Sequence, residues 1–114
     1  MGVSKYLKEQ SNAVTVIGCE PSEGSRIPGI RKWPKAYLPK IFDQSRVDQM
    51  IEVSETQAKE MTRRLAKEEG IFCGMSSGGA VHAAVQLAST LDGGTIVCII
   101  CDRGDRYLSS DIFE

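Results

Sequence analysis

The hexapeptide GMSSGG, residues 74–79, contains a serine in the G-x-S-x-G spacing that many hydrolases use for a nucleophile. A nucleophilic Ser76 needs a general base within hydrogen-bond reach and an acid that orients this base, and in such hydrolases both follow the serine. His82 is the only histidine, and its helical spacing with Gln86 and Ser89 predicts a polar stripe that faces solvent. The chain offers no suitable partner for a nucleophilic serine, so we do not predict a hydrolase.

Two other roles are open for this serine-glycine turn. Ser76 or Ser77 can cap a helix, with Gly78 and Gly79 allowing close packing of its first turn. A turn of this kind between a strand and a helix also lies at the edge where open α/β sheets bind ligands. Residues 101–107, CDRGDRY, would leave a predicted strand at its carboxyl end and open onto the same crevice. We also expect the charged side chains of this segment to pair with one another: Asp102, Arg103, Asp105 and Arg106.

The elements that must position these residues alternate along the chain. Apolar, β-branched runs predict three strands: residues 13–19, 48–53 and 95–101. Glu20-Pro21 would end the first strand, and we expect the last strand to be the most strongly buried. Helical periodicity predicts three helices: residues 2–10, 54–70 and about 77–91. This alternation predicts an α/β fold with an open parallel sheet flanked by helices.

The second predicted helix carries the clearest local signals. Ser54 and Gln57 have the spacing of a capping box, in which each side chain satisfies an exposed amide at the helix start. Ala58, Met61 and Leu65 would face the core, and Gly70 would end the helix. The third helix has apolar residues over a wide arc, so we expect it to be largely buried.

Residues 21–47 show no regular pattern, although they hold all four prolines and the only tryptophan. Long loops in compact domains are usually functional. Between residues 21 and 40 there are five cations and one carboxylate, a local balance of +4 in a chain with a net charge of −1: Arg26, Arg31, Lys32, Lys35, Lys40 and Glu23. This stretch is either a clamp for a small anion or a solvated surface loop.

The composition limits the class of protein. A chain of 114 residues is one domain or a piece of one, and 41% hydrophobic with 25% charged residues is typical of globular proteins rather than disordered ones. The charge balance gives no indication of nucleic-acid binding, and no apolar run is long enough to span a membrane. Without a signal-peptide pattern, we expect a cytoplasmic protein. Cys98 and Cys101 would point to opposite faces of a strand, so we expect no metal site.

Three stretches carry a resemblance to a known family: EGIFCGMSSGGAV, IICDRGDRYLS and GSRIPGIRKWPKAYLPKIFD. Together they resemble the C-terminal part of cysteine synthases of the B type, which are fold type II enzymes that depend on pyridoxal 5'-phosphate. The resemblance covers essentially the whole chain. The third stretch is the most specific, because it separates the B type from the A type of this family.

The resemblance implies a cofactor site and a substrate site. It implies that the Ser76 hydroxyl meets the pyridine nitrogen of pyridoxal 5'-phosphate, and that Cys101 and Asp102 lie beside the cofactor ring. Arg31 and Trp33 match a catalytic loop at the mouth of the active site. The implied substrates are O-acetyl-L-serine, which loses acetate, and sulfide or thiosulfate, which replaces it. The family usually forms homodimers.

The resemblance also implies that catalytic parts lie outside these residues. The family's Schiff-base lysine and its cofactor-binding asparagine belong to an N-terminal region, and no lysine of this chain matches the catalytic one. We therefore expect residues 1–114 to be an incomplete C-terminal domain with a lid-like loop at 21–47, inactive alone. The alternative is a free-standing α/β binding module for an anionic metabolite or a protein partner.

Overall fold

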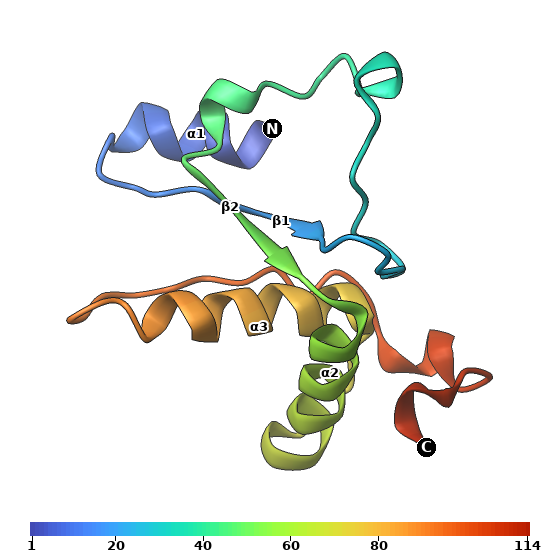
Figure 1. Cartoon of the computed structure of the whole chain (residues 1–114). Helices are drawn as coiled ribbons and strands as arrows, with labels where there is room; N and C mark the ends of the chain where they lie inside the picture. Colours follow the sequence, from blue (N-terminus) through green and yellow to red (C-terminus); the bar gives the residue numbers. More distant parts are fainter.

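The computed structural model describes residues 1–114, which form three α-helices and a two-stranded sheet (Figure 1). The elements follow one another as α1 (Gly2–Gln10), β1 (Ile17–Pro21), β2 (Gln49–Val53), α2 (Glu55–Glu69) and α3 (Met75–Ala88). Short 3-10 turns complete the chain: Lys35–Tyr37, Gln44–Arg46, Gly104–Tyr107 and Asp111–Phe113. The predicted α/β class is confirmed, as are all three helices. No helix is long and apolar enough to cross a membrane.

The sheet is parallel, as predicted. Its register pairs Ile17 with Gln49 and Pro21 with Val53. The prediction that β1 stops before Glu20-Pro21 is wrong, because the strand includes both residues. In a parallel ladder alternate residues donate to the neighbouring strand, and the Ser22 amide donates to the Val53 carbonyl at 2.9 Å. The ladder therefore does not need an N–H at Pro21.

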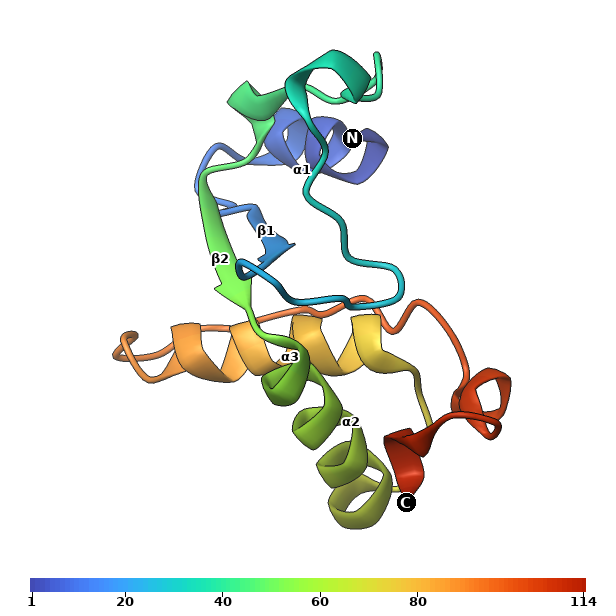
Figure 2. The same cartoon turned by 45° about the vertical axis from the view of Figure 1, so that its right-hand side comes forward.

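Residues 95–101 do not form a strand, so that prediction is wrong. Their apolar side chains are exposed, with Val97 81% and Ile99 62% accessible. A strand requires a hydrogen-bonded neighbour, and this segment instead runs alongside α3 without a ladder (Figures 1 and 2). One specific contact holds its end, where the Cys101 amide donates to the Ser77 hydroxyl at 3.0 Å. The apolar pattern thus marks a segment that has no strand partner within these residues.

Helix α2 matches its local signals. The Ser54 hydroxyl accepts from the Gln57 amide at 3.1 Å, and the Gln57 side chain accepts from the Ser54 amide at 2.9 Å. Gly70 ends the helix in the left-handed region at φ 68°. The buried face also includes Thr62, whose hydroxyl donates to the Ala58 carbonyl at 2.7 Å.

Helix α3 begins earlier and ends earlier than predicted, at Met75 and Ala88. Its first turn is buried, but its last turn is largely exposed, and Val85 is 54% accessible. The crossing of α2 and α3 is so close that a side chain at position 78 would collide with Thr62 and with the Ala58 carbonyl, and Gly78 makes this approach possible. The main core lies where this crossing meets the sheet and two loop segments: Ile27, Ile51, Val53, Ala58, Met75, Ala83 and Ile112.

Candidate functional site

Ser76 lies in the first turn of α3, where the residue is buried but its hydroxyl makes no hydrogen bond to the rest of the chain. The predicted capping role is wrong for both serines, because Gly74 is the N-cap residue and no side chain caps the helix. Ser76 is therefore a largely buried residue whose hydroxyl is not used by the fold and is not fully enclosed by it. A hydroxyl that is held at a packed helix start, open to solvent and without a partner is a candidate for binding a ligand.

The neighbouring serine has a different task. The Ser77 hydroxyl accepts from the Cys101 amide at 3.0 Å and donates to the Asp102 carboxylate at 3.3 Å. Ser77 is fully buried, and these bonds hold the segment that follows residues 95–100 against the start of α3. The structure thus places two of the predicted cofactor residues, Cys101 and Asp102, against Ser77, the residue that follows Ser76.

Asp102 is the centre of this small network. Its carboxylate accepts from the Gly74 amide at 3.1 Å, from the Ser77 hydroxyl and from the Tyr107 hydroxyl. The hydrogen bond to Asp102, together with burial, raises the pKa of Tyr107 and keeps its hydroxyl a donor. The expected pairing with neighbouring arginines is confirmed only for Arg103, which pairs with Asp105 at 3.1 Å.

A glycine is required at position 74 by the same network. A Cβ atom there would lie 2.5 and 2.6 Å from the two carboxylate oxygens of Asp102, and it would also collide with the Tyr107 ring. Cys73, just before it, is fully buried, and burial raises the pKa of its thiol. The start of α3 is therefore fixed by packing on the side of residues 101–107.

Arg31 and Trp33 lie on the long loop, and both are exposed. The Arg31 guanidinium stands 5.8 Å from the centre of the Trp33 ring, in the range of a cation–π contact. Both line a hollow of ≈600 Å³ that also includes Arg26, Lys32 and the turn at residues 27–30. Lys32 pairs with Glu20 at 3.2 Å, and this bond raises its pKa, so Arg26 and Arg31 are the cations of the hollow without an ion-pair partner.

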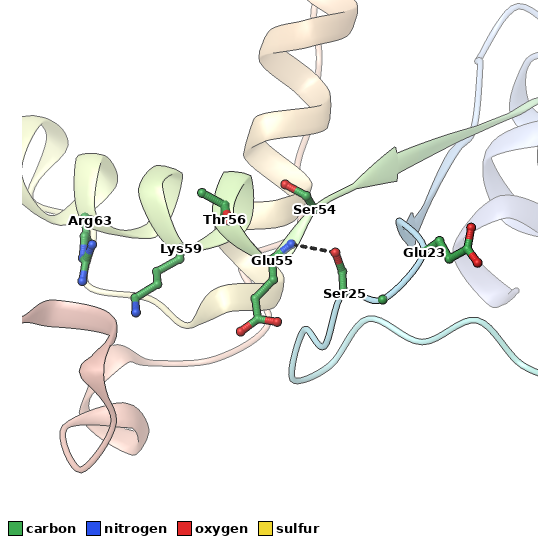
Figure 3. Close-up of a pocket in the computed structure, with 8 residues that line it drawn as sticks. Glu23, Ser25, Ser54, Glu55, Thr56, Lys59 and Arg63 are labelled. Carbon is green, nitrogen blue, oxygen red and sulfur yellow. Dashed lines mark hydrogen bonds between the residues drawn. The ribbon is translucent and has the colours of Figure 1, made fainter.

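A second hollow lies at the start of α2, and its lining is entirely polar (Figure 3). Its volume is ≈550 Å³. Its cations are already used, because Lys59 pairs with Asp111 and Arg63 donates to the carbonyls of Asp111, Ile112 and Glu114. This hollow therefore anchors the end of the chain and does not suit an aromatic ring.

Ser77, Tyr107 and Gly29 contribute to the site, although no sequence pattern selects them. The sequence predicts only a possible cap at Ser77 and only the end of a charged segment at Tyr107. Gly29 lies on the long loop, against Ser76. Ser77 contacts Cys101 over 24 residues and Gly29 contacts Ser76 over 47. Tyr107 binds Asp102 only five residues away, but Asp102 meets the start of α3 over 28 residues, at Gly74. No local pattern reports contacts over that separation.

Comparison with known proteins gives the class to which this fold and site belong. Residues 1–102 match the family described as pyridoxal-phosphate dependent enzyme, and the chain belongs to this family. It is 59% identical to cysteine synthase B of Pseudomonas aeruginosa over 114 residues, which are 100% of this chain and 38% of that protein. It is 53% identical to cysteine synthase B of Escherichia coli over 112 residues, which are 98% of this chain and 37% of that protein.

Solved structures agree with this assignment. The crystal structure of cysteine synthase from Entamoeba histolytica superposes with a TM-score of 0.89 at 35% identity, covering 98% of this chain and 36% of that one. The crystal structure of O-ureido-L-serine synthase superposes with a TM-score of 0.88 at 33% identity, covering 99% of this chain and 38% of that one. The predicted resemblance and the fold type II architecture are confirmed. The chain spans little more than a third of the length of these relatives.

Proposed function

We propose that this chain is the C-terminal portion of a pyridoxal-phosphate dependent cysteine synthase of the B type. The enzyme would replace the acetate of O-acetyl-L-serine by sulfide or thiosulfate. The identity of 59% over all 114 residues supports this assignment. The single structural observation that carries it is the Ser76 hydroxyl, which has no partner within the fold and lies at a helix start whose next residue, Ser77, binds Cys101 and Asp102.

The residues present fit the cofactor. A pyridine nitrogen needs one hydrogen-bonding group in a confined place, and Ser76 provides such a group at a helix start whose geometry is fixed by Ser77 and Asp102. The bound cofactor supplies an electron sink for breaking the bond to the leaving group. A neutral hydroxyl does not hold a proton on the ring nitrogen as a carboxylate would. Ser76 therefore favours a weaker electron sink, which suits departure of a good leaving group such as acetate.

Asp102 would act on the site through its neighbours. Its carboxylate is bonded to the Gly74 amide and to the side chains of Ser77 and Tyr107. These bonds fix the loop of residues 101–107 relative to the first turn of α3. We propose that Asp102 thereby holds Ser76 and Cys101 at a constant distance from the cofactor ring.

Arg31 and Trp33 would admit and hold the sulfur donor. Thiosulfate is a dianion, and a guanidinium can bind two of its oxygens at once. The contact with the Trp33 ring restrains Arg31, so less side-chain freedom is lost when the anion binds. Neutral or singly charged sulfide needs this help far less, so the loop favours the larger donor.

The assay for this proposal is formation of cysteine by the full-length protein that carries these residues. With pyridoxal phosphate and O-acetyl-L-serine, we expect cysteine from sulfide and the S-sulfonated product from thiosulfate. Mass spectrometry identifies both products. A protein that binds pyridoxal phosphate but forms neither product would contradict the proposed activity. We also propose a cytoplasmic homodimer, as the resemblance implies, and light scattering of the purified protein tests its mass.

The alternative of a free-standing binding module accounts for the basic loop but not for the rest of the surface. Residues 96–100 expose four apolar side chains in a row around Cys98: Ile96, Val97, Ile99 and Ile100. Single-domain soluble proteins rarely leave a large contiguous apolar patch exposed to solvent. This segment favours a larger protein in which further strands cover it.

A further inference from the structure

The turn at residues 27–30, IPGI, is the point where the long loop contacts the candidate site. The Ile30 amide donates to the Ile27 carbonyl at 3.1 Å, which closes a β-turn. Gly29 has φ +93°, and Pro28 precedes it. Proline at the second position and a glycine with positive φ at the third are the signature of a type II turn.

Three contacts seat this turn on α3, whose first residues lie directly below it in both views (Figures 1 and 2). Ile27 is 4% exposed and belongs to the same core cluster as Met75. The Ile30 side chain fills the space over Gly79, where a Cβ atom would lie 2.7 Å from its Cδ1. Between them, Gly29 faces Ser76 directly.

The contact between Gly29 and Ser76 leaves no room for a side chain. A Cβ atom at position 29 would lie 2.8 Å from the Ser76 Cβ and 2.9 Å from its hydroxyl oxygen. The Ser76 Cβ is attached to a helix that is held by Gly78 against α2 and by Asp102 at Gly74, so it cannot rotate away. Either the turn or the serine would have to move.

We propose that Gly29 is a positioning residue for Ser76. Its bare Cα lets the turn close over the serine and sets the direction in which the hydroxyl reaches the cofactor ring. Because Arg31 follows the turn directly, the same contact ties the position of the anion-binding loop to that of the cofactor hydroxyl. This inference rests on the proposed function, since it assigns the Ser76 hydroxyl to the cofactor.

Backbone strain alone would also make Gly29→Ala unfavourable, so a matched control is needed. Gly70 has φ +68°, and a Cβ atom there would meet nothing within 4 Å. Gly70→Ala therefore introduces the same kind of strain, but without a collision and at the far end of α2. A difference between the two variants reports the contact with Ser76.

The test uses the full-length protein and measures the dissociation constant and the absorption spectrum of bound pyridoxal phosphate. We expect Gly29→Ala to weaken cofactor binding about tenfold and to shift its absorption band. Gly70→Ala should lower the unfolding temperature but leave the affinity and the band unchanged. If Gly29→Ala and Gly70→Ala both bind the cofactor with the affinity and the spectrum of the unaltered protein, the inference is wrong. If the unaltered protein binds no pyridoxal phosphate, the proposed function itself fails, and the inference falls with it.

A double-mutant cycle with Ser76→Gly separates the contact from a general effect on the turn. Removing the Ser76 Cβ removes the atom that the alanine methyl would strike. We therefore expect Gly29→Ala to change cofactor affinity less than about twofold in the Ser76→Gly background, a non-additive result. Equal effects in both backgrounds would overturn the inference. If Gly29→Ala alone does not fold, recovery of folding in the double variant supports the contact, and no recovery contradicts it.

Discussion

At the scale of single residues, two adjacent serines divide the work of the site. Ser77 joins the segment at Cys101 to α3, whereas the Ser76 hydroxyl is left without a partner. Consecutive residues on a helix point in directions about 100° apart, so one faces the packed segment and the other faces the site. The sequence indicates that these serines matter, but not which of them is structural. That distinction depends on where residues 101–107 return to the helix.

Tyr107 gives a pH-dependent test of the network around Asp102. The hydrogen bond to Asp102 raises the pKa of Tyr107 above its ordinary value of 10.0. The stability that this bond supplies is therefore present below pH 10.0 and is lost as the pH rises through the raised pKa of the folded state. We expect Tyr107→Phe to cost about 1 kcal/mol of unfolding free energy at neutral pH. The cost should shrink above pH 10.0 in urea titrations, and a pH-independent cost would contradict this role.

At the scale of elements, local signals predict helices well and strands poorly. The capping box at Ser54 and the left-handed Gly70 locate both ends of α2 because each acts within a few residues. Residues 95–101 have the best strand composition in the chain and yet form none, because pairing needs a partner from elsewhere. The start of α3 differs from the sequence prediction for a related reason. The Gly74 amide is satisfied by the distant Asp102 side chain and not by a nearby serine.

The crossing of α2 and α3 depends on Gly78. A Cβ atom there would lie 2.5 Å from the Ala58 carbonyl oxygen and 2.8 Å from the Thr62 amide nitrogen, which are backbone atoms that cannot rotate aside. We expect Gly78→Ala to lower the unfolding free energy by about 1–3 kcal/mol in denaturant titrations. Gly93→Ala is the control, since nothing lies within 4 Å of a Cβ atom there. Equal stabilities of the two variants would show that the helices separate at little cost.

The long loop gives a test of donor selectivity. Arg31→Ala removes the guanidinium that stands against Trp33, and we expect the KM for thiosulfate to rise about tenfold, as for loss of a charged hydrogen bond. The KM for sulfide should change much less. Lys35→Ala removes the same charge from an exposed position in the loop, and steady-state assays should show little effect on either donor. A similar change for both donors in Arg31→Ala would remove the anion-binding role.

At the scale of the whole molecule, three segments far apart in the sequence meet at the start of α3. The turn at residues 27–30 packs on Ser76, α2 packs on Gly78, and residues 101–107 bind Gly74 and Ser77. Each contact requires a glycine or a serine in the hexapeptide, which explains its composition better than capping does. Meanwhile, apolar side chains of α1, the loop and residues 96–100 remain exposed. The chain is therefore closely packed around the site and uncovered away from it.

The central claim is that the Ser76 hydroxyl serves the cofactor and not the fold. Comparing Ser76→Ala with Ser77→Ala in the full-length enzyme tests it most directly. For Ser76→Ala we expect the rate of acetate elimination to fall at least tenfold, about 1.4 kcal/mol, with an unfolding free energy within about 0.5 kcal/mol of the unaltered protein. Ser77→Ala should instead lose about 1–3 kcal/mol of stability, because it leaves the Cys101 amide without a partner and removes one of the hydrogen bonds to Asp102. Unchanged acetate elimination in a well-folded, cofactor-loaded Ser76→Ala enzyme would contradict the account.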